Sequence, residues 1–163
     1  IDVIYNPFYA YSNSVVSVWL SKSKWDDDLL FINSDILLEP ALLKNIINVK
    51  ARFTVLVKQG EKNGYRVMVK LGRVKKMSMD IPDKMAFGVY AGVTKIRRIA
   101  CTYFGNLVEE WLAAGRWNDW YEDVVSKIAS RSRDVKLILI GPLFWHEIDT
   151  PEDLTELKKV LKK

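Results

Sequence analysis

Two aspartates follow apolar runs of the chain, at positions where a metal ion could be held. Asp35 comes shortly after the run Leu29–Ile32, and Asp149 lies a little beyond the run 135–140. In open α/β sheets, ligands bind at the carboxyl edge of the strands. One or two protein carboxylates, together with substrate phosphates and water, commonly hold Mg²⁺. Taken singly, each aspartate is explained by a turn or a helix cap; together they predict a Mg²⁺ site at one rim of a sheet.

The composition excludes several other kinds of site. The 163 residues include one cysteine, Cys101, and one histidine, His146, whereas zinc fingers, multi-histidine metal sites and disulfide frameworks need several. The formal charge of +5 favours anionic ligands. No apolar run reaches the roughly 20 residues of a membrane helix, and no signal peptide opens the chain. We therefore expect a cytoplasmic protein without a membrane partner.

Short apolar runs alternate with amphipathic segments, which is the pattern of a layered α/β fold. Strands are predicted at 2–5, 29–32, 53–57, 65–70, 73–78, 87–94 and 135–140, and helices from Ser12 or Asn13, from Pro40, over 97–114, over 119–130 and from Thr150. The strands at 65–70 and 73–78 read as an inserted hairpin. We expect one domain over 1–163, a three-layer Rossmann-like α/β fold with a mixed, mainly parallel sheet.

Two helices have faces that can be predicted. In the helix over 97–114, the core side is expected to carry Ile99, Tyr103, Leu107, Trp111 and Leu112. The last helix is expected to begin with Thr150 as N-cap and Asp153 three residues later. Its core side would then carry Leu154, Leu157 and Leu161, with the terminal lysines on a solvated face.

Five short motifs resemble, in the same order, those of nucleotidyltransferases. They are Asn6-Pro7-Phe8-Tyr9 with Asn13 and Ser17, Phe31-Ile32-Asn33-Ser34-Asp35, Gly88-Val89-Tyr90-Ala91-Gly92, Trp120-Tyr121-Glu122-Asp123, and the most specific one, Trp145-His146-Glu147-Ile148-Asp149-Thr150-Pro151-Glu152-Asp153-Leu154. The sequence is similar to the sugar-phosphate, phosphocholine and inositol-phosphate cytidylyltransferase branch, over nearly its whole length.

The resemblance implies a nucleotide-diphospho-sugar transferase-like fold. It also implies transfer of a nucleoside monophosphate from a nucleoside triphosphate to a phosphorylated small molecule, with release of pyrophosphate. It assigns catalysis and Mg²⁺ binding to Asp35 and Asp149. It assigns substrate binding to Asn6, Asn13, Tyr90, Gly92, Glu122, Asp123 and Glu147. An acceptor phosphate is already ionised at pH 7, so this chemistry needs no histidine base.

Some of these residues have an equally ordinary explanation. Glu122 and Asp123 fall in the first turn of a predicted helix, where acidic residues favour the helix dipole. Trp111, Trp117 and Trp120 would form either a wall for a choline-like cation or part of the core.

The sequence departs from the family pattern in two ways. The family's glycine-rich loop, which wraps the triphosphate, does not occur in it. Since the chain opens on Ile1 and on a predicted strand, we expect the missing strand, loop and helix to lie upstream, and we expect the chain alone to be inactive. In addition, Met79 and Val89 stand where related sequences often have Lys and Glu. Lys75, Lys76 or Lys84 are then the candidates for binding the acceptor phosphate. The nucleobase, the acceptor and homo-oligomerisation are left open.

Three other functions are compatible with parts of the sequence. A noncatalytic, degenerate relative would share the motifs without the activity. A nucleotide-sugar-dependent glycosyltransferase could use Asp26-Asp27-Asp28 for its metal, although these residues read as a solvated turn. A basic nucleic-acid-binding module would use Arg97, Arg98, Arg131 and Arg133 with the lysine-rich end. Nucleic acid is not the expected partner, because no sequence-reading motif accompanies these charges.

Overall fold

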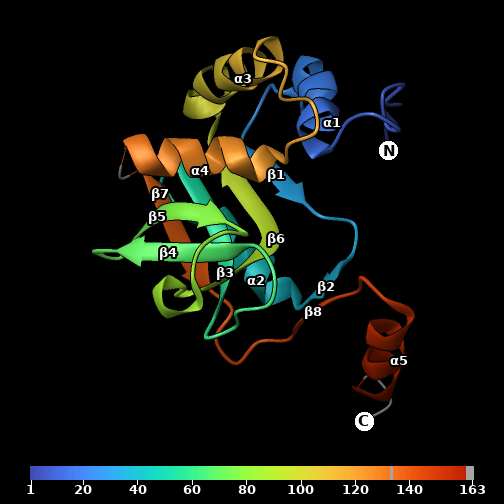
Figure 1. Ribbon diagram of the computed structural model, residues 1–163, viewed down its shortest axis with the longest axis vertical. Coiled ribbons are helices and arrows are strands. Elements are labelled where there is room, and N and C mark those ends of the chain that lie inside the picture. The colour runs from blue at the N-terminus through green and yellow to red at the C-terminus, as the bar shows by residue number, and fades with distance from the viewer. Residues whose placement is uncertain (133, 161–163) are drawn as a thin grey trace.

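The computed structural model describes residues 1–132 and 134–160, and its centre is a six-stranded sheet (Figure 1). The strands are β1 (Leu29–Ile32), β3 (Phe53–Gln59), β4 (Arg66–Lys70), β5 (Arg73–Ser78), β6 (Gly88–Ile96) and β7 (Val135–Leu139). Their order is β5-β4-β6-β3-β7, and β1 also pairs with β6. The predicted strands after residue 28, including the hairpin β4–β5, are therefore present.

The sheet is mixed, as predicted, but it is not mainly parallel. Among the described pairs, β3–β7 is parallel, whereas β1–β6, β3–β6, β4–β5 and β4–β6 are antiparallel. Strand β6 accounts for most of the antiparallel pairs, because it is antiparallel to all three strands with which it pairs. Its first residues pair with β4 and its last four with β1, so one long strand joins the hairpin to the rest of the sheet.

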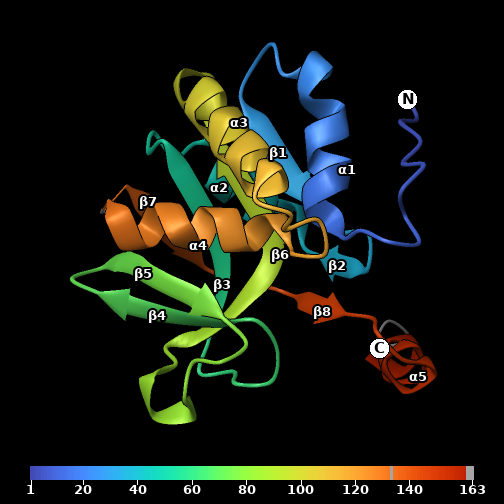
Figure 2. The ribbon, with the colours of Figure 1, turned by 45° about the horizontal axis from the view of Figure 1, so that its top comes forward.

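Helices cover both faces of the sheet, giving the three expected layers (Figure 2). Helices α1 (Ser14–Leu20), α3 (Arg98–Ala113) and α4 (Tyr121–Arg131) lie on one face, and α2 (Pro40–Ile47) lies on the other. Side chains of a strand alternate between faces. Accordingly, Val55 and Val57 of β3 pack with α1, α3 and α4, while Leu56 packs with Leu42 and Ile46 of α2. The fold class predicted from the sequence is thus confirmed.

The core face of α3 agrees with the predicted one only in part. Ile99 and Tyr103 are 68% and 44% exposed, whereas Ala100, Phe104 and Val108 are buried. Leu107 and Leu112 are buried as predicted, and Trp111 packs against the core while partly exposed, so the prediction is wrong only for the first half of the helix. Small residues let this helix approach its neighbours closely: a Cβ on Gly105 would lie only 3.0 Å from Lys22 Cε.

The first predicted strand, over residues 2–5, is wrong. This segment is irregular, and Val3 and Tyr5 are 90% and 72% exposed. A strand requires a hydrogen-bonded neighbour, and none of the strands in the described part of the chain pairs with these residues.

The helix ends follow the predictions more closely. Asn13 caps α1 by accepting the Ser14 N–H at 2.7 Å. Thr150 precedes α5 (Pro151–Val160), and its hydroxyl accepts the N–H of Asp153, whose carboxylate accepts the Thr150 N–H at 2.8 Å. In α5, Leu157 is buried and Leu154 is 40% exposed. The predicted core residue Leu161 and the expected basic residues Arg133, Lys162 and Lys163 lie outside the described residues.

A second, two-stranded sheet was not predicted. It pairs β2 (Ile36–Leu38) with β8 (Trp145–Glu147) in antiparallel fashion. Two short 3-10 helices, η1 (Ser21–Lys24) and η2 (Asp83–Met85), complete the described elements. None of the helices in the described part of the chain is long and apolar enough to cross a bilayer.

Candidate functional site

The β2–β8 pair brings three carboxylates together. Asp35 precedes β2, Glu147 ends β8, and Asp149 lies two residues beyond it. Ile36 is paired with Glu147, and the N–H of Ile148 donates to the carbonyl oxygen of Asp35 at 2.8 Å. One carboxylate oxygen of each acid lies within 4.8 Å of those of the other two. We call Asp35, Glu147 and Asp149 the acidic trio.

The acidic trio fits a hard divalent cation. One oxygen of Asp35, Oδ1, is buried without a hydrogen-bond partner. Removal from water, assisted by the charges of Asp149 and Asp35, raises the pKa of Glu147 to about 7. Carboxylates held close together in this way repel one another unless a cation lies between them. Oxygen ligands from one or two carboxylates plus substrate and water are what Mg²⁺ prefers.

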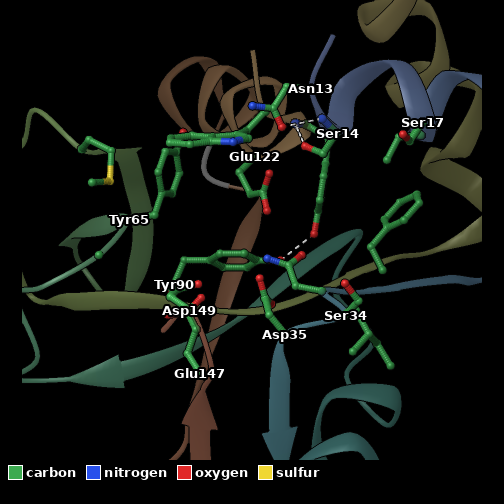
Figure 3. A pocket seen from close by; sticks show the side chains of 18 of the residues that line it. Asn13, Ser14, Ser17, Ser34, Asp35, Tyr65, Tyr90, Glu122, Glu147 and Asp149 are labelled. Carbon is green, nitrogen blue, oxygen red and sulfur yellow. Dashed lines mark hydrogen bonds between the residues drawn. The ribbon is translucent and has the colours of Figure 1, made fainter. Parts of the chain in front are cut away.

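The trio faces a pocket of about 690 Å³ (Figure 3). Polar side chains of the first turns of α1 and α4 and of the loop before β2 contribute to its wall. Its lining residues are Asn13, Ser14, Ser17, Val18, Ser21, Phe31, Ile32, Asn33, Ser34, Asp35, Gly64, Tyr65, Met79, Tyr90, Trp120, Tyr121, Glu122, Glu147 and Asp149. The charged members of this set are all acidic, so the pocket is strongly negative although the chain is basic.

The structure divides the residues that were predicted to bind substrate. Asn13, Tyr90, Glu122 and Glu147 line the pocket, as do Asp35 and Asp149. Asn6, Gly92 and Asp123 are not among the lining residues. Asn6 instead donates to the hydroxyls of Ser12 and Ser17 at 3.3 and 3.1 Å, so it supports the N-terminal end of α1.

Gly92 acts on the position of Asp35. Its φ is +73°, and a Cβ there would lie 2.9 Å from Ile36 Cγ2 and 3.3 Å from Asn33 Cβ. Its carbonyl oxygen accepts the N–H of Asn33 at 2.9 Å. A side chain at this position would push the loop carrying Asp35 away from β6.

Glu122 and Asp123 have different surroundings although they are neighbours. Asp123 accepts the Trp120 N–H at 3.1 Å, which fits the helix-end explanation, and it also accepts the hydroxyl of Tyr65. Glu122 points into the pocket above the trio (Figure 3). It is 6% exposed, and its Oε2 has no hydrogen-bond partner. Burial, and to a smaller extent Asp123 and Asp35, raises the pKa of Glu122 to about 7.

Aromatic side chains form the wall around Glu122. Tyr65 and Trp120 meet edge to face with ring centroids 5.5 Å apart. The buried hydroxyl of Tyr90 is bonded to those of Tyr121 and Thr94 at 2.6 and 2.9 Å. Tyr65 is not among the residues that the sequence predicts for the site, although its position directly after Gly64, in the hairpin region, is an indication of such a role.

The other tryptophans lie elsewhere. Trp111 is covered by the guanidinium of Arg116, 3.6 Å from the ring centroid. Trp117 packs edge-on against Phe8 and donates to the carbonyl oxygen of Leu112. Of the three tryptophans considered for a cation-binding wall, only Trp120 lines the pocket.

The candidate lysines and the Asp26–Asp28 run do not reach the pocket. Lys75, Lys76 and Lys84 are not among its lining residues, and Lys75 donates to the carbonyl oxygen of Ser130. Asp28 accepts the Arg98 N–H at the start of α3 and pairs with the buried ammonium of Lys95 at 3.2 Å. Asp28 is therefore a structural residue and not part of a purely solvated turn.

Comparison with solved structures identifies the fold. The inositol-1-phosphate CTP transferase from T. maritima superposes with a TM-score of 0.77 at 20% identity, over 97% of this chain and 64% of that one. The CTP:phosphocholine cytidylyltransferase from Streptococcus pneumoniae gives 0.79 at 18% identity, over 99% and 69%. A protein described as a glucose-1-phosphate thymidylyltransferase from Bacillus anthracis gives 0.71 at 11% identity, over 91% and 61%.

Comparison by sequence alone finds no relative. No protein-family model matches the chain, and no curated protein matches it. The chain spans about two thirds of the length of the solved structures to which it is similar. At these identities the likeness concerns the fold: this chain folds as nucleotidyltransferases do.

Proposed function

We propose that this chain forms the metal-binding and acceptor-binding part of a nucleotidyltransferase. The reaction moves a nucleoside monophosphate from a nucleoside triphosphate to a phosphate monoester. The observation that carries the proposal is the convergence of Asp35, Glu147 and Asp149 at one pocket of a chain with this fold. The solved structures to which it is similar include enzymes named for inositol 1-phosphate and phosphocholine.

In the proposed reaction an oxygen of the acceptor phosphate attacks the α-phosphorus of the triphosphate. The bond from that phosphorus to the bridging oxygen breaks, and pyrophosphate leaves with its electron pair. The acceptor oxygen is already ionised near neutral pH, so no side chain has to remove a proton from it. Catalysis then depends on positioning and on neutralising negative charge.

The residues of this chain have separate tasks in the proposal. Asp35, Glu147 and Asp149 hold Mg²⁺, which neutralises phosphate charge when bound. The Ile148–Asp35 hydrogen bond keeps the two carboxylate-bearing segments together, and Gly92 lets the segment that carries Asp35 lie close to β6. The glycine-rich loop for the triphosphate does not occur within the 163 residues, so these residues account for the metal and the acceptor only.

The test uses the protein expressed from its complete gene. Nucleoside triphosphates are supplied with phosphocholine, sugar 1-phosphates, inositol phosphate or glycerol phosphate, and pyrophosphate is measured. We expect Mg²⁺-dependent pyrophosphate release that Asp35→Ala and Asp149→Ala each reduce by at least about a hundredfold. Glu110→Gln, at an exposed position on α3, is the control and should retain activity.

Three outcomes would contradict the proposal. Full activity of both alanine variants would show that the trio does not hold the catalytic metal. Consumption of a nucleotide sugar without pyrophosphate release would instead indicate a glycosyltransferase. A folded complete protein that binds Mg²⁺ at the trio and turns over no substrate pair would indicate the noncatalytic relative.

A further inference from the structure

The pocket has an unusual charge balance for a site that binds a phosphate ester. Its charged lining residues are Asp35, Glu122, Glu147 and Asp149, and no Lys, Arg or His lines it among the described residues. A single divalent cation at the trio would offset only part of this charge. The part of an acceptor that lies beyond the metal therefore meets a negative field, which disfavours anionic groups and favours cationic ones.

Glu122 adds a negative charge to the pocket at a place separate from the acidic trio. Its side chain comes from α4, and only 6% of the residue is exposed. A buried carboxylate oxygen without a hydrogen-bond donor costs free energy, and the cost is greater when the group is ionised. Among the described residues none donates to Oε2 of Glu122. A ligand that supplies both a positive charge and an N–H would remove this cost.

The aromatic residues beside Glu122 suit the same kind of group. Tyr65, Tyr90 and Trp120 line the pocket with Glu122, and Figure 3 shows Glu122 above Tyr90 and to one side of Tyr65. Asp123 holds the Tyr65 hydroxyl, and Tyr121 and Thr94 hold that of Tyr90. The rings are thus fixed before a ligand binds, and aromatic faces attract cations. We call Glu122, Tyr65, Tyr90 and Trp120 the acid–aromatic subsite.

We propose that the acid–aromatic subsite binds an ammonium group of the acceptor, so that the substrate is an aminoalkyl phosphate whose nitrogen carries hydrogen. This inference rests on the proposed function for the phosphate end of the acceptor. A quaternary ammonium satisfies the aromatic rings but has no hydrogen for the Glu122 carboxylate. A neutral polyol donates hydrogen bonds but leaves the carboxylate charge uncompensated.

Binding tests the proposal without requiring turnover. Phosphoethanolamine, phosphocholine and glycerol phosphate are titrated calorimetrically into the complete protein with saturating Mg²⁺ at pH 8. The three compounds share the phosphate monoester and differ at the other end. We expect phosphoethanolamine to bind at least about tenfold more tightly than either of the others.

Variants test the residues. Glu122→Gln should abolish the preference for phosphoethanolamine over glycerol phosphate. Trp120→Leu should reduce this preference severalfold, and it should leave the core intact because Trp120 is 41% exposed. Glu110→Gln should leave all three affinities unchanged. A preference that survives in folded Glu122→Gln protein, as judged by circular dichroism, would overturn the assignment of Glu122. If Glu122→Gln does not fold, the Trp120→Leu result decides.

The subsite and the reaction can fail separately. Equal affinities for phosphoethanolamine and glycerol phosphate overturn the subsite even if pyrophosphate is released. Phosphocholine binding as tightly as phosphoethanolamine overturns the requirement for an N–H. Preferential, Glu122-dependent binding of phosphoethanolamine supports the subsite even if no nucleotidyl transfer is found, in which case it is the reaction that is wrong.

Discussion

The backbone N–H of Ile148 donates to the carbonyl oxygen of Asp35 at 2.8 Å, directly beyond the pairing of Ile36 with Glu147. This hydrogen bond lies between the two segments that carry the acidic trio. The separation of the Asp35 carboxylate from those of Glu147 and Asp149 is therefore set by backbone pairing and does not depend on side-chain rotamers alone.

Removal of this N–H should weaken cation binding. Ile148→Pro cannot donate the bond, and a backbone hydrogen bond contributes about 1 kcal/mol, so we expect roughly a five- to tenfold loss of Mn²⁺ affinity, measured by titration. Ile148→Ala retains the N–H and serves as the control. Equal affinities of the two variants would mean that the β2–β8 pairing does not position the trio.

Repulsion within the trio should affect the metal-free protein. Glu147→Gln removes one of three neighbouring carboxylates, so the melting temperature without metal should rise. The increase in melting temperature on adding Mg²⁺ should become smaller, because one ligand is lost. Glu156→Gln, at an exposed position of α5, should change neither value. A lower melting temperature of metal-free Glu147→Gln would contradict the expected repulsion.

Glu122 should make stability depend on pH. Its pKa is about 7 in the folded protein, raised chiefly by burial from an ordinary value of 4.5. Between these values the folded state binds more protons than the unfolded state, so stability falls as pH rises and the full cost is present above pH 7. This cost is at most about 3 kcal/mol.

The expected consequence is that Glu122→Gln is more stable than the wild type at pH 8. The advantage should shrink as pH falls through 7 and disappear below about 4.5, where Glu122 is protonated in both states. Urea unfolding at pH 8, 6 and 4.5 measures it. A Glu122→Gln protein that is less stable than the wild type at pH 8 would show that the carboxylate is compensated in the folded protein.

Gly92 and Gly141 provide a matched pair for the loop that carries Asp35. Both have positive φ, +73° and +60°, but a Cβ at Gly141 meets nothing within 4 Å, whereas one at Gly92 meets Ile36 and Asn33. Both alanine variants should lose about 1–2 kcal/mol from backbone strain. Only Gly92→Ala should lose more, and only it should lower Mn²⁺ affinity. Equal Mn²⁺ affinities in the two variants would mean that the close approach at Gly92 is not needed.

Local patterns predicted the elements well where they depend on neighbours in the sequence. The caps Asn13 and Thr150 and the hairpin β4–β5 are where the residue types place them. The strand predicted over residues 2–5 is absent, because whether a segment pairs with another strand depends on residues far away in the sequence. The predicted face of α3 is correct for Leu107 and Leu112 but wrong for Ile99 and Tyr103, because apolar spacing alone does not show which side of the first turns meets the sheet.

The site was predictable only in part, because its geometry depends on contacts between segments that are far apart in the sequence. The motif order drew attention to Asp35, Glu147 and Asp149, but the three-residue strands β2 and β8 that join them are too short for a pattern of their own. The different roles of Glu122 and Asp123 depend on where α4 meets the hairpin. No spacing in the sequence distinguishes a side chain that caps a helix from its neighbour that enters a pocket.

The pairing of β2 with β8 has a consequence for the order of folding. Most of the chain lies between Ile36 and Glu147, so closing this loop is entropically costly and we expect it to follow formation of the main sheet. During synthesis the trio cannot assemble until β8 has left the ribosome. A divalent cation should therefore slow unfolding of the finished molecule far more than it accelerates the early steps of folding.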